Sequence, residues 1–84
     1  MNPTLAEALP DAIAKVSEWI GQQEAQAKEM DELSPGAGEG QRFMAKVVRV
    51  KRDAAVAAQQ SGDVVAMIAA YQAIKPALDL ATAE

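Results

Sequence analysis

Residues 34–40 read Ser-Pro-Gly-Ala-Gly-Glu-Gly, with three glycines and one proline in seven positions. A helix interior does not tolerate this composition, because glycine is conformationally permissive and proline removes a backbone N–H donor. A second interruption, Ser-Gly-Asp at residues 61–63, supplies Ser61 and Asp63 as candidate N-caps. The three segments between the breaks are rich in Ala, Glu, Gln, Lys and Met, which are strong helix formers. We therefore expect a flexible Gly/Pro loop at 34–40 between helical segments.

The apolar residues of each segment recur at alternating spacings of three and four. This spacing places them on one side of a helix and does not fit the period of two of a strand. The predicted stripes contain Ala6, Leu9, Ile13, Val16, Ile20, Gln23, Ala27 and Met30 in the first segment, Phe43, Val47, Val50, Ala54 and Ala57 in the second, and Val64, Met67, Tyr71, Ile74, Leu78 and Ala81 in the third. We expect each stripe to face the core.

The pattern predicts an all-α protein, a small three-helix bundle with helices over roughly 10–33, 41–60 and 63–82. At about 1.5 Å per residue these helices have similar lengths of roughly 30 Å, so they can pack side by side. The break at 61–63 is short enough to make the last two helices an antiparallel hairpin. A chain of this size forms one domain, so we expect a single helical domain over residues 1–84.

Two prolines bear on the helix boundaries. Pro10 is expected at the start of the first long helix, where its missing N–H costs nothing, with residues 3–9 as a short helical turn or kinked extension. Pro76 falls within the third helix, so we expect it to kink that helix near residues 72–76 or to end its regular part.

Nearly half of the hydrophobic residues are small, because 19 of the 42 are Ala, which leaves 23 larger apolar side chains. A partner or a second copy would bury more apolar area. Val48, Val65 and Ile68 fall outside the predicted stripes, and Trp19 lies at the edge of the first. The first three are candidate contacts of a partner-binding surface on the second and third helices, and Trp19 is a candidate binding anchor on the first. The alternative is that a helix with two neighbours needs a wider apolar face, and that Trp19 covers a small core.

The charges are segregated along the chain. Residues 1–41 carry eight acids and two bases, residues 42–52 carry five bases and no acid, and residues 53–84 carry four acids and one base. The basic cluster contains Arg42, Lys46, Arg49, Lys51 and Arg52. It is either a site for phosphate, nucleic acid or an acidic protein, or it pairs with the acidic first helix. The acids available for such pairing include Glu18, Glu24, Glu29, Asp31 and Glu32.

The composition also excludes several kinds of chemistry. With no Cys and no His, the chain has no disulfide, thiolate metal site, cysteine nucleophile or histidine base. Phosphate-loop, dinucleotide, nucleophile-elbow and zinc-protease motifs are missing. We therefore expect no enzyme activity, no cofactor, no metal and no small-molecule substrate. The longest uncharged run, residues 64–74, is shorter than a membrane span, and no secretory signal is visible, so we expect a cytoplasmic protein with no membrane contact.

Three functions remain as hypotheses. The first is a protein-interaction module, an oligomerising accessory or adaptor subunit that binds itself or another protein through the second and third helices. The second is a small acidic inhibitor, of the phage or mobile-element type, that blocks a basic or nucleic-acid-binding surface through Glu24, Glu29 and Glu32. The third, which the overall acidity disfavours, is nucleic-acid binding through the basic cluster.

Overall fold

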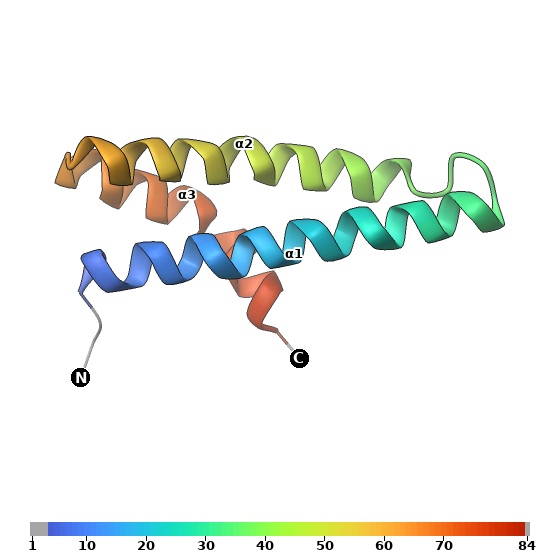
Figure 1. The fold of residues 1–84 in the computed structure, drawn as a ribbon, viewed down its shortest axis with the longest axis horizontal. Coiled ribbons are helices and arrows are strands. Elements are labelled where there is room, and N and C mark those ends of the chain that lie inside the picture. Colours follow the sequence, from blue (N-terminus) through green and yellow to red (C-terminus); the bar gives the residue numbers. More distant parts are fainter. Residues whose placement is uncertain (1–3, 84) are drawn as a thin grey trace.

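The computed structural model describes residues 4–83, and this part of the chain contains three α-helices and no strand. They are α1 (Leu5–Leu33), α2 (Glu39–Ser61) and α3 (Val64–Thr82). The long helices α1 and α2 lie side by side and antiparallel, and α3 turns back along them (Figure 1). The predicted all-α three-helix bundle and its final antiparallel hairpin are confirmed. The molecule measures 44 × 25 × 15 Å.

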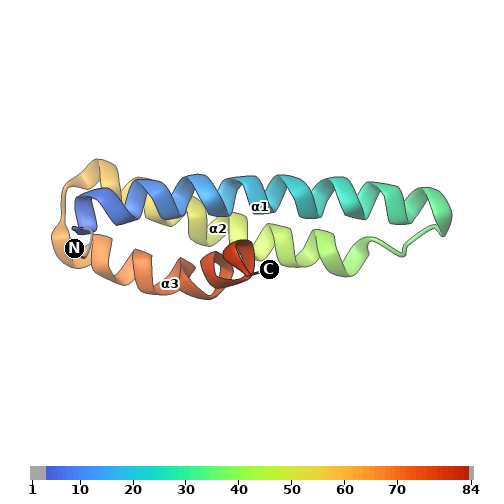
Figure 2. The same cartoon turned by 90° about the horizontal axis from the view of Figure 1, so that it is seen from below.

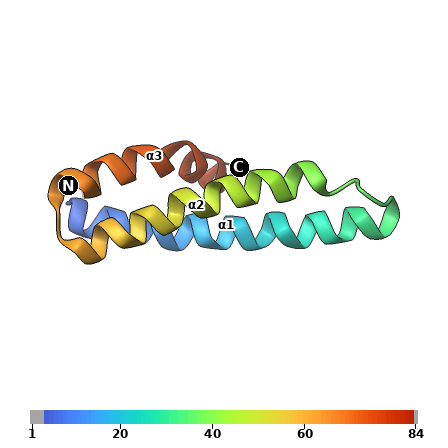
Figure 3. The same cartoon turned by 90° about the horizontal axis from the view of Figure 1, so that it is seen from above.

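The helix α3 is the shortest and covers only one half of the α1–α2 pair. Seen from below and from above, it ends near the middle of α1 and leaves the half beside the α1–α2 loop as two helices (Figures 2 and 3). Its C-terminal half, which contains Pro76, bends and crosses α1 (Figure 1). The expected effect of Pro76 agrees with this bend, because proline cannot donate to the carbonyl one turn earlier.

The first helix begins earlier than the sequence predicted. It starts at Leu5, whereas we expected a start at Pro10, and Pro10 lies inside it. The carbonyl of Thr4 accepts the first helical bonds from the N–H groups of Glu7 and Ala8. Leu9 is fully buried beside Pro10, so its packing offsets the one backbone hydrogen bond that the proline removes. Residue 3, where the helical turn or kinked extension over residues 3–9 was expected to begin, lies outside the described residues.

The connection between α1 and α2 is held by specific contacts. The N–H of Gly38 donates to Oδ1 of Asp31 at 2.8 Å, and Arg42 forms an ion pair with the same carboxylate. Gly38 packs so closely on α1 that a side-chain Cβ there would overlap the backbone of Ala27. Gly36 has a φ of +87°, a conformation that favours glycine. The second helix begins directly after this segment, at Glu39.

The second turn follows its sequence signals. Gly62 ends α2 in the left-handed conformation, with a φ of +72°. Asp63 then caps α3, because its Oδ1 accepts from the N–H of Val65 at 3.0 Å and of Ala66 at 3.3 Å. The prediction that Asp63 is an N-cap is confirmed, whereas Ser61 remains the last residue of α2.

The core consists of two small clusters. Both join all three helices, and the second lies nearer the start of α1. The buried members of the first are Val16, Ile20, Ala45, Val48 and Ala77, and those of the second are Leu9, Ala12, Ala55 and Ile74. All of the α2 residues in these clusters but Val48 are alanines. The small side chains allow α2 to approach both neighbours closely, which is why its alanine face is the buried one.

This packing corrects the predicted orientation of α2. Val48, expected on a partner-binding surface, is only 5% exposed and belongs to the core. Phe43 and Val50, expected in the core, are each 66% exposed. The helix carries two apolar stripes, and spacing alone does not distinguish them. The stripe with more alanines packs inward because it permits the shorter distance between helix axes.

Candidate protein-interaction surface

The face of α2 that points away from the other helices is apolar. It carries Phe43, Val47, Val50, Ala54 and Ala57, which we call the seam. Their spacings of four, three, four and three place them in one line along the helix. Val47 is partly buried and the other four are exposed. A line of apolar side chains with Phe43 and Val50 in solvent marks a candidate contact surface.

A shallow groove of about 100 Å³ joins the seam to α3. Met44, Val47 and Lys51 line it from α2, and its α3 wall contains Pro76 and Leu80. Met44 and Leu80 are both about half exposed. The groove therefore extends the apolar surface from one helix to the next.

The outer side of α3 is also apolar. Val65 and Ile68 are exposed near the start of α3, whereas Leu80 lies near its end. Of the helices in residues 4–83, α3 alone is long and apolar enough to cross a membrane, a test that core helices of soluble proteins also pass. Only 17% of its apolar window is buried. The structure thus places Val65 and Ile68 at the surface, whereas Val48 is buried.

Trp19 packs at the edge of the core. It is partly buried and packs against the cluster that contains Val16 and Val48. It also lines a hollow of about 160 Å³ with α3 residues that include Thr82. This hollow involves α1 and α3, so Trp19 does not line the α2–α3 groove. The position agrees with the alternative in which the tryptophan covers a small core.

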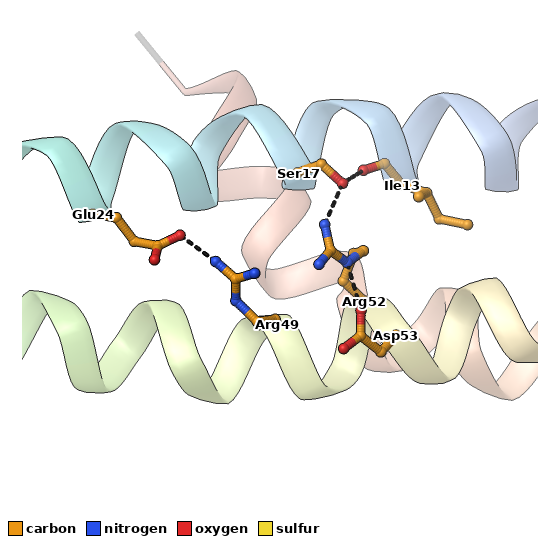
Figure 4. A network of polar contacts seen from close by, with 6 residues as sticks. All are labelled: Ile13, Ser17, Glu24, Arg49, Arg52 and Asp53. Carbon is orange, nitrogen blue, oxygen red and sulfur yellow. Dashed lines mark hydrogen bonds and ion pairs between the residues drawn. The ribbon is translucent and has the colours of Figure 1, made fainter.

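The basic cluster connects α2 to α1. Arg42 pairs with Asp31, and Arg49 pairs with Glu24. Figure 4 shows the second pair and, one turn further along α2, the guanidinium of Arg52. These contacts support the interpretation in which the basic residues complement the acidic first helix. Within residues 4–83, Lys46 and Lys51 are the two members of the cluster that form no ion pair.

Arg52 is the most enclosed of these bases. Its Nη1 donates to Oγ of Ser17 at 2.9 Å, and its Nε donates to Asp53 at 2.9 Å. Oγ of Ser17 in turn donates to the carbonyl of Ile13 at 2.7 Å, so the hydroxyl group is both donor and acceptor (Figure 4). Arg52 is thus a structural link between α1 and α2.

The remaining charged candidates are exposed. Glu29 and Glu32 lie near the end of α1, and Lys46 lies on α2 beside the seam. None of these three forms an ion pair with another residue among positions 4–83. The three acids expected to contact a basic partner therefore differ: Glu24 forms an ion pair with Arg49, whereas Glu29 and Glu32 form none within residues 4–83.

The carboxylate of Asp31 takes part in both a backbone hydrogen bond and an ion pair. The hydrogen bond from the N–H of Gly38 holds the pKa of Asp31 below its ordinary value, and the Arg42 guanidinium lowers it further. Both partners follow Asp31 in the sequence: Gly38 lies in the loop and Arg42 lies on α2. Asp31 therefore fixes the start of α2 against the end of α1.

A wider groove of about 420 Å³ lies between α1 and α3. Four of its charged groups are paired within their own helices, Asp11 with Lys15 at 3.0 Å and Lys75 with Asp79 at 2.7 Å, and Glu7 also lines it. The bond to Asp79 raises the pKa of Lys75. Because these pairs are exposed and each forms within its own helix, they contribute little to holding α1 and α3 together.

Within residues 4–83, no group of three or more acidic side chains is arranged to hold a metal ion. No known protein family, curated protein or solved structure matches this chain. Sequence reasoning missed the seam, because its spacing was assigned to the core. The signal was present as an unbroken four-three repeat on a helix that also carries a second, alanine-rich stripe.

Proposed function

We propose that this protein is a non-enzymatic protein-interaction module, an oligomerising accessory or adaptor subunit that docks through the seam and the α2–α3 groove. The observation that carries the proposal is the exposure of Phe43 and Val50, 66% each, on a regular apolar line. Apolar area in contact with water costs about 25 cal/mol per Å², so covering these side chains favours association.

The surroundings of the seam support the same function. Leu80 and Met44 are half exposed at the adjoining groove, so the apolar area continues onto α3. Lysines border it, Lys46 on one side and Lys51 on the other. An apolar centre with a charged border is the usual composition of a protein–protein interface.

A second candidate is a small acidic inhibitor that occupies a basic surface of a larger complex. Glu29 and Glu32 support it, because both are exposed near the tip of the α1–α2 pair. Glu24, which we expected to contribute, pairs with Arg49 instead. This reduces the acidic surface available to a basic partner.

Charge reversal at the two surfaces distinguishes the candidates. Phe43→Glu with Val50→Glu places carboxylates on the seam, and Glu29→Lys with Glu32→Lys reverses the acidic tip. All four positions are exposed, so both variants are expected to keep the helical circular dichroism of the parent. Binding is followed by affinity purification from the native host, with light scattering of the purified chain.

We expect the seam variant to lose the bound proteins, including any second copy, and the tip variant to keep them. The reverse result would support the inhibitor. If both variants kept every partner of the parent chain, neither surface would be the docking site.

A further inference from the structure

We propose that the partner on the seam is a second copy of this chain, with α2 packed antiparallel against the partner's α2 across a twofold axis. This rests on the proposed function and gives it a particular partner. The seam follows the heptad rule of a coiled coil, with Phe43 and Val50 at d positions and Val47 and Ala54 at a positions. In the antiparallel arrangement, Val47 faces the partner's Val50.

The charges beside the seam favour this orientation. Lys46 and Asp53 are seven residues apart and lie on the same flank of α2, at g positions. In an antiparallel pair each g position meets a g position of the other helix, so Lys46 faces the partner's Asp53. The twofold axis repeats this contact, which gives two equivalent pairs. In a parallel pair Lys46 would instead face the partner's Lys51, and the like charges would repel.

The other flank is compatible with the same arrangement. It carries Met44 and Lys51 at e positions, beside the groove to α3. Met44 then faces the partner's Lys51, whose aliphatic stem can cover the thioether while its ammonium group stays in water. The second copy would thus cover both the seam and part of the α2–α3 groove.

The exposed area of one chain is suited to such a dimer. The accessible surface is 5594 Å², whereas a compact monomer of 8.8 kDa exposes about 4800 Å². The radius of gyration is 14.3 Å, against about 12 Å for a compact domain of this length. The excess of several hundred Å² is of the order that a stable dimer buries, roughly 800 Å² per partner.

The first test is the mass of the purified chain in solution, measured by sedimentation equilibrium over a wide concentration range. We expect a monomer–dimer equilibrium. Val50→Glu brings two carboxylates together near the twofold axis and should raise the dissociation constant at least about 100-fold. Lys46→Glu should raise it about tenfold, and Lys46→Glu combined with Asp53→Lys should restore it, because the two charges exchange places. Lys28→Glu, an exposed change on α1, is the matched control and should leave it unchanged.

Cross-linking tests the orientation, and the chain has no native cysteine to interfere. Antiparallel packing places Phe43 opposite the partner's Ala54. Chains with Phe43→Cys and chains with Ala54→Cys should therefore form disulfides when mixed and not when oxidised alone. A parallel dimer would give the opposite result.

A monomer at every concentration would overturn the second copy as the partner. The proposed function would then stand or fall on its own test, the loss of other bound proteins from the seam variant. A dimer that Val50→Glu does not weaken would overturn the seam as its interface.

Discussion

Val48 and Val50 lie two residues apart on α2 and have opposite surroundings: Val48 is buried between α1 and α3, and Val50 projects into solvent on the seam. A helix rotates about 100° per residue, so two steps carry the side chain to the other side. The same chemical group is therefore a core contact at one position and an interaction candidate at the other.

Truncation to alanine distinguishes these roles. Val48→Ala removes buried methyl groups and leaves a cavity, so we expect the free energy of unfolding to fall by about 2 kcal/mol. Val50→Ala should change it by less than about 0.5 kcal/mol. Urea denaturation of both variants at low protein concentration, where self-association contributes least, measures the difference. Equal losses at the two positions would contradict the orientation of α2.

The fold could be predicted because helix periodicity and chain breaks are local properties. The breaks at 34–40 and 61–63 contain glycines that the structure uses at positive φ, Gly36 and Gly62. The orientation of α2 could not be predicted in the same way. Its two apolar stripes have equivalent spacing, and the choice between them depends on how closely α1 and α3 approach, which is a tertiary property.

The same limit applies to the candidate surface. The sequence predicts Val65 and Ile68 at the surface because they lie beside the α3 stripe, of which Ile74 is buried and Met67, Tyr71 and Leu78 are partly buried. The three-four spacing predicts Phe43 and Val50 in the core and leaves Val48 outside the stripe, on the candidate surface. Spacing carries no information on how close the helices lie, and the small core between them takes alanines and one valine from α2.

Gly38 is required by the close approach of the loop to α1. A Cβ at this position would overlap the backbone of Ala27, which cannot move aside as a flexible side chain would. Since the φ of −89° is one that alanine adopts readily, the cost of Gly38→Ala is steric alone. We expect a loss of about 2 kcal/mol in the free energy of unfolding.

Gly21→Ala is the matched control for this change. Gly21 lies within α1, and a Cβ there meets no atom within 4 Å. Alanine is the better helix former, so this variant should be about 1 kcal/mol more stable than the parent chain in thermal or urea denaturation. If Gly38→Ala were as stable as Gly21→Ala, the close contact with Ala27 would be wrong.

Asp31 gives the protein a pH dependence with a definite sign. Its pKa is lowered in the folded chain, first by the Gly38 N–H and then by Arg42, from an ordinary value of 3.8. The unfolded chain therefore takes up this proton more readily. The stabilisation is fully present above about pH 4 and is lost as the pH falls through the lower, folded-state pKa.

Asp31→Asn should remove this step, because the amide oxygen still accepts from Gly38 but carries no charge for Arg42 to stabilise. We expect the urea midpoint of the variant to fall less than that of the parent between about pH 6 and pH 2. Glu29→Gln, an exposed change on the same helix, should keep the full pH dependence of the parent. An identical pH profile for Asp31→Asn and the parent would contradict the assignment.

The link between Ser17 and Arg52 is expected to stabilise the fold more than the ion pair between Glu24 and Arg49. The Arg52 side chain is 21% exposed, whereas the side chains of Glu24 and Arg49 are each about half exposed. Water and salt screen an exposed pair, so its contribution is typically below about 1 kcal/mol. A charged donor on a partly buried hydroxyl is screened less and contributes about 1 kcal/mol or more.

Double-mutant cycles measure the two couplings directly, with Ser17→Ala and Arg52→Met for one, and Glu24→Gln and Arg49→Met for the other. Methionine keeps much of the aliphatic packing of arginine while it removes the charge. We expect the first coupling to persist in 0.5 M salt and the second to fall towards zero, because only the exposed pair is accessible to the ions. A larger coupling for Glu24 and Arg49, or a Ser17–Arg52 coupling that disappears in salt, would show that Arg52 is not the main polar link between α1 and α2.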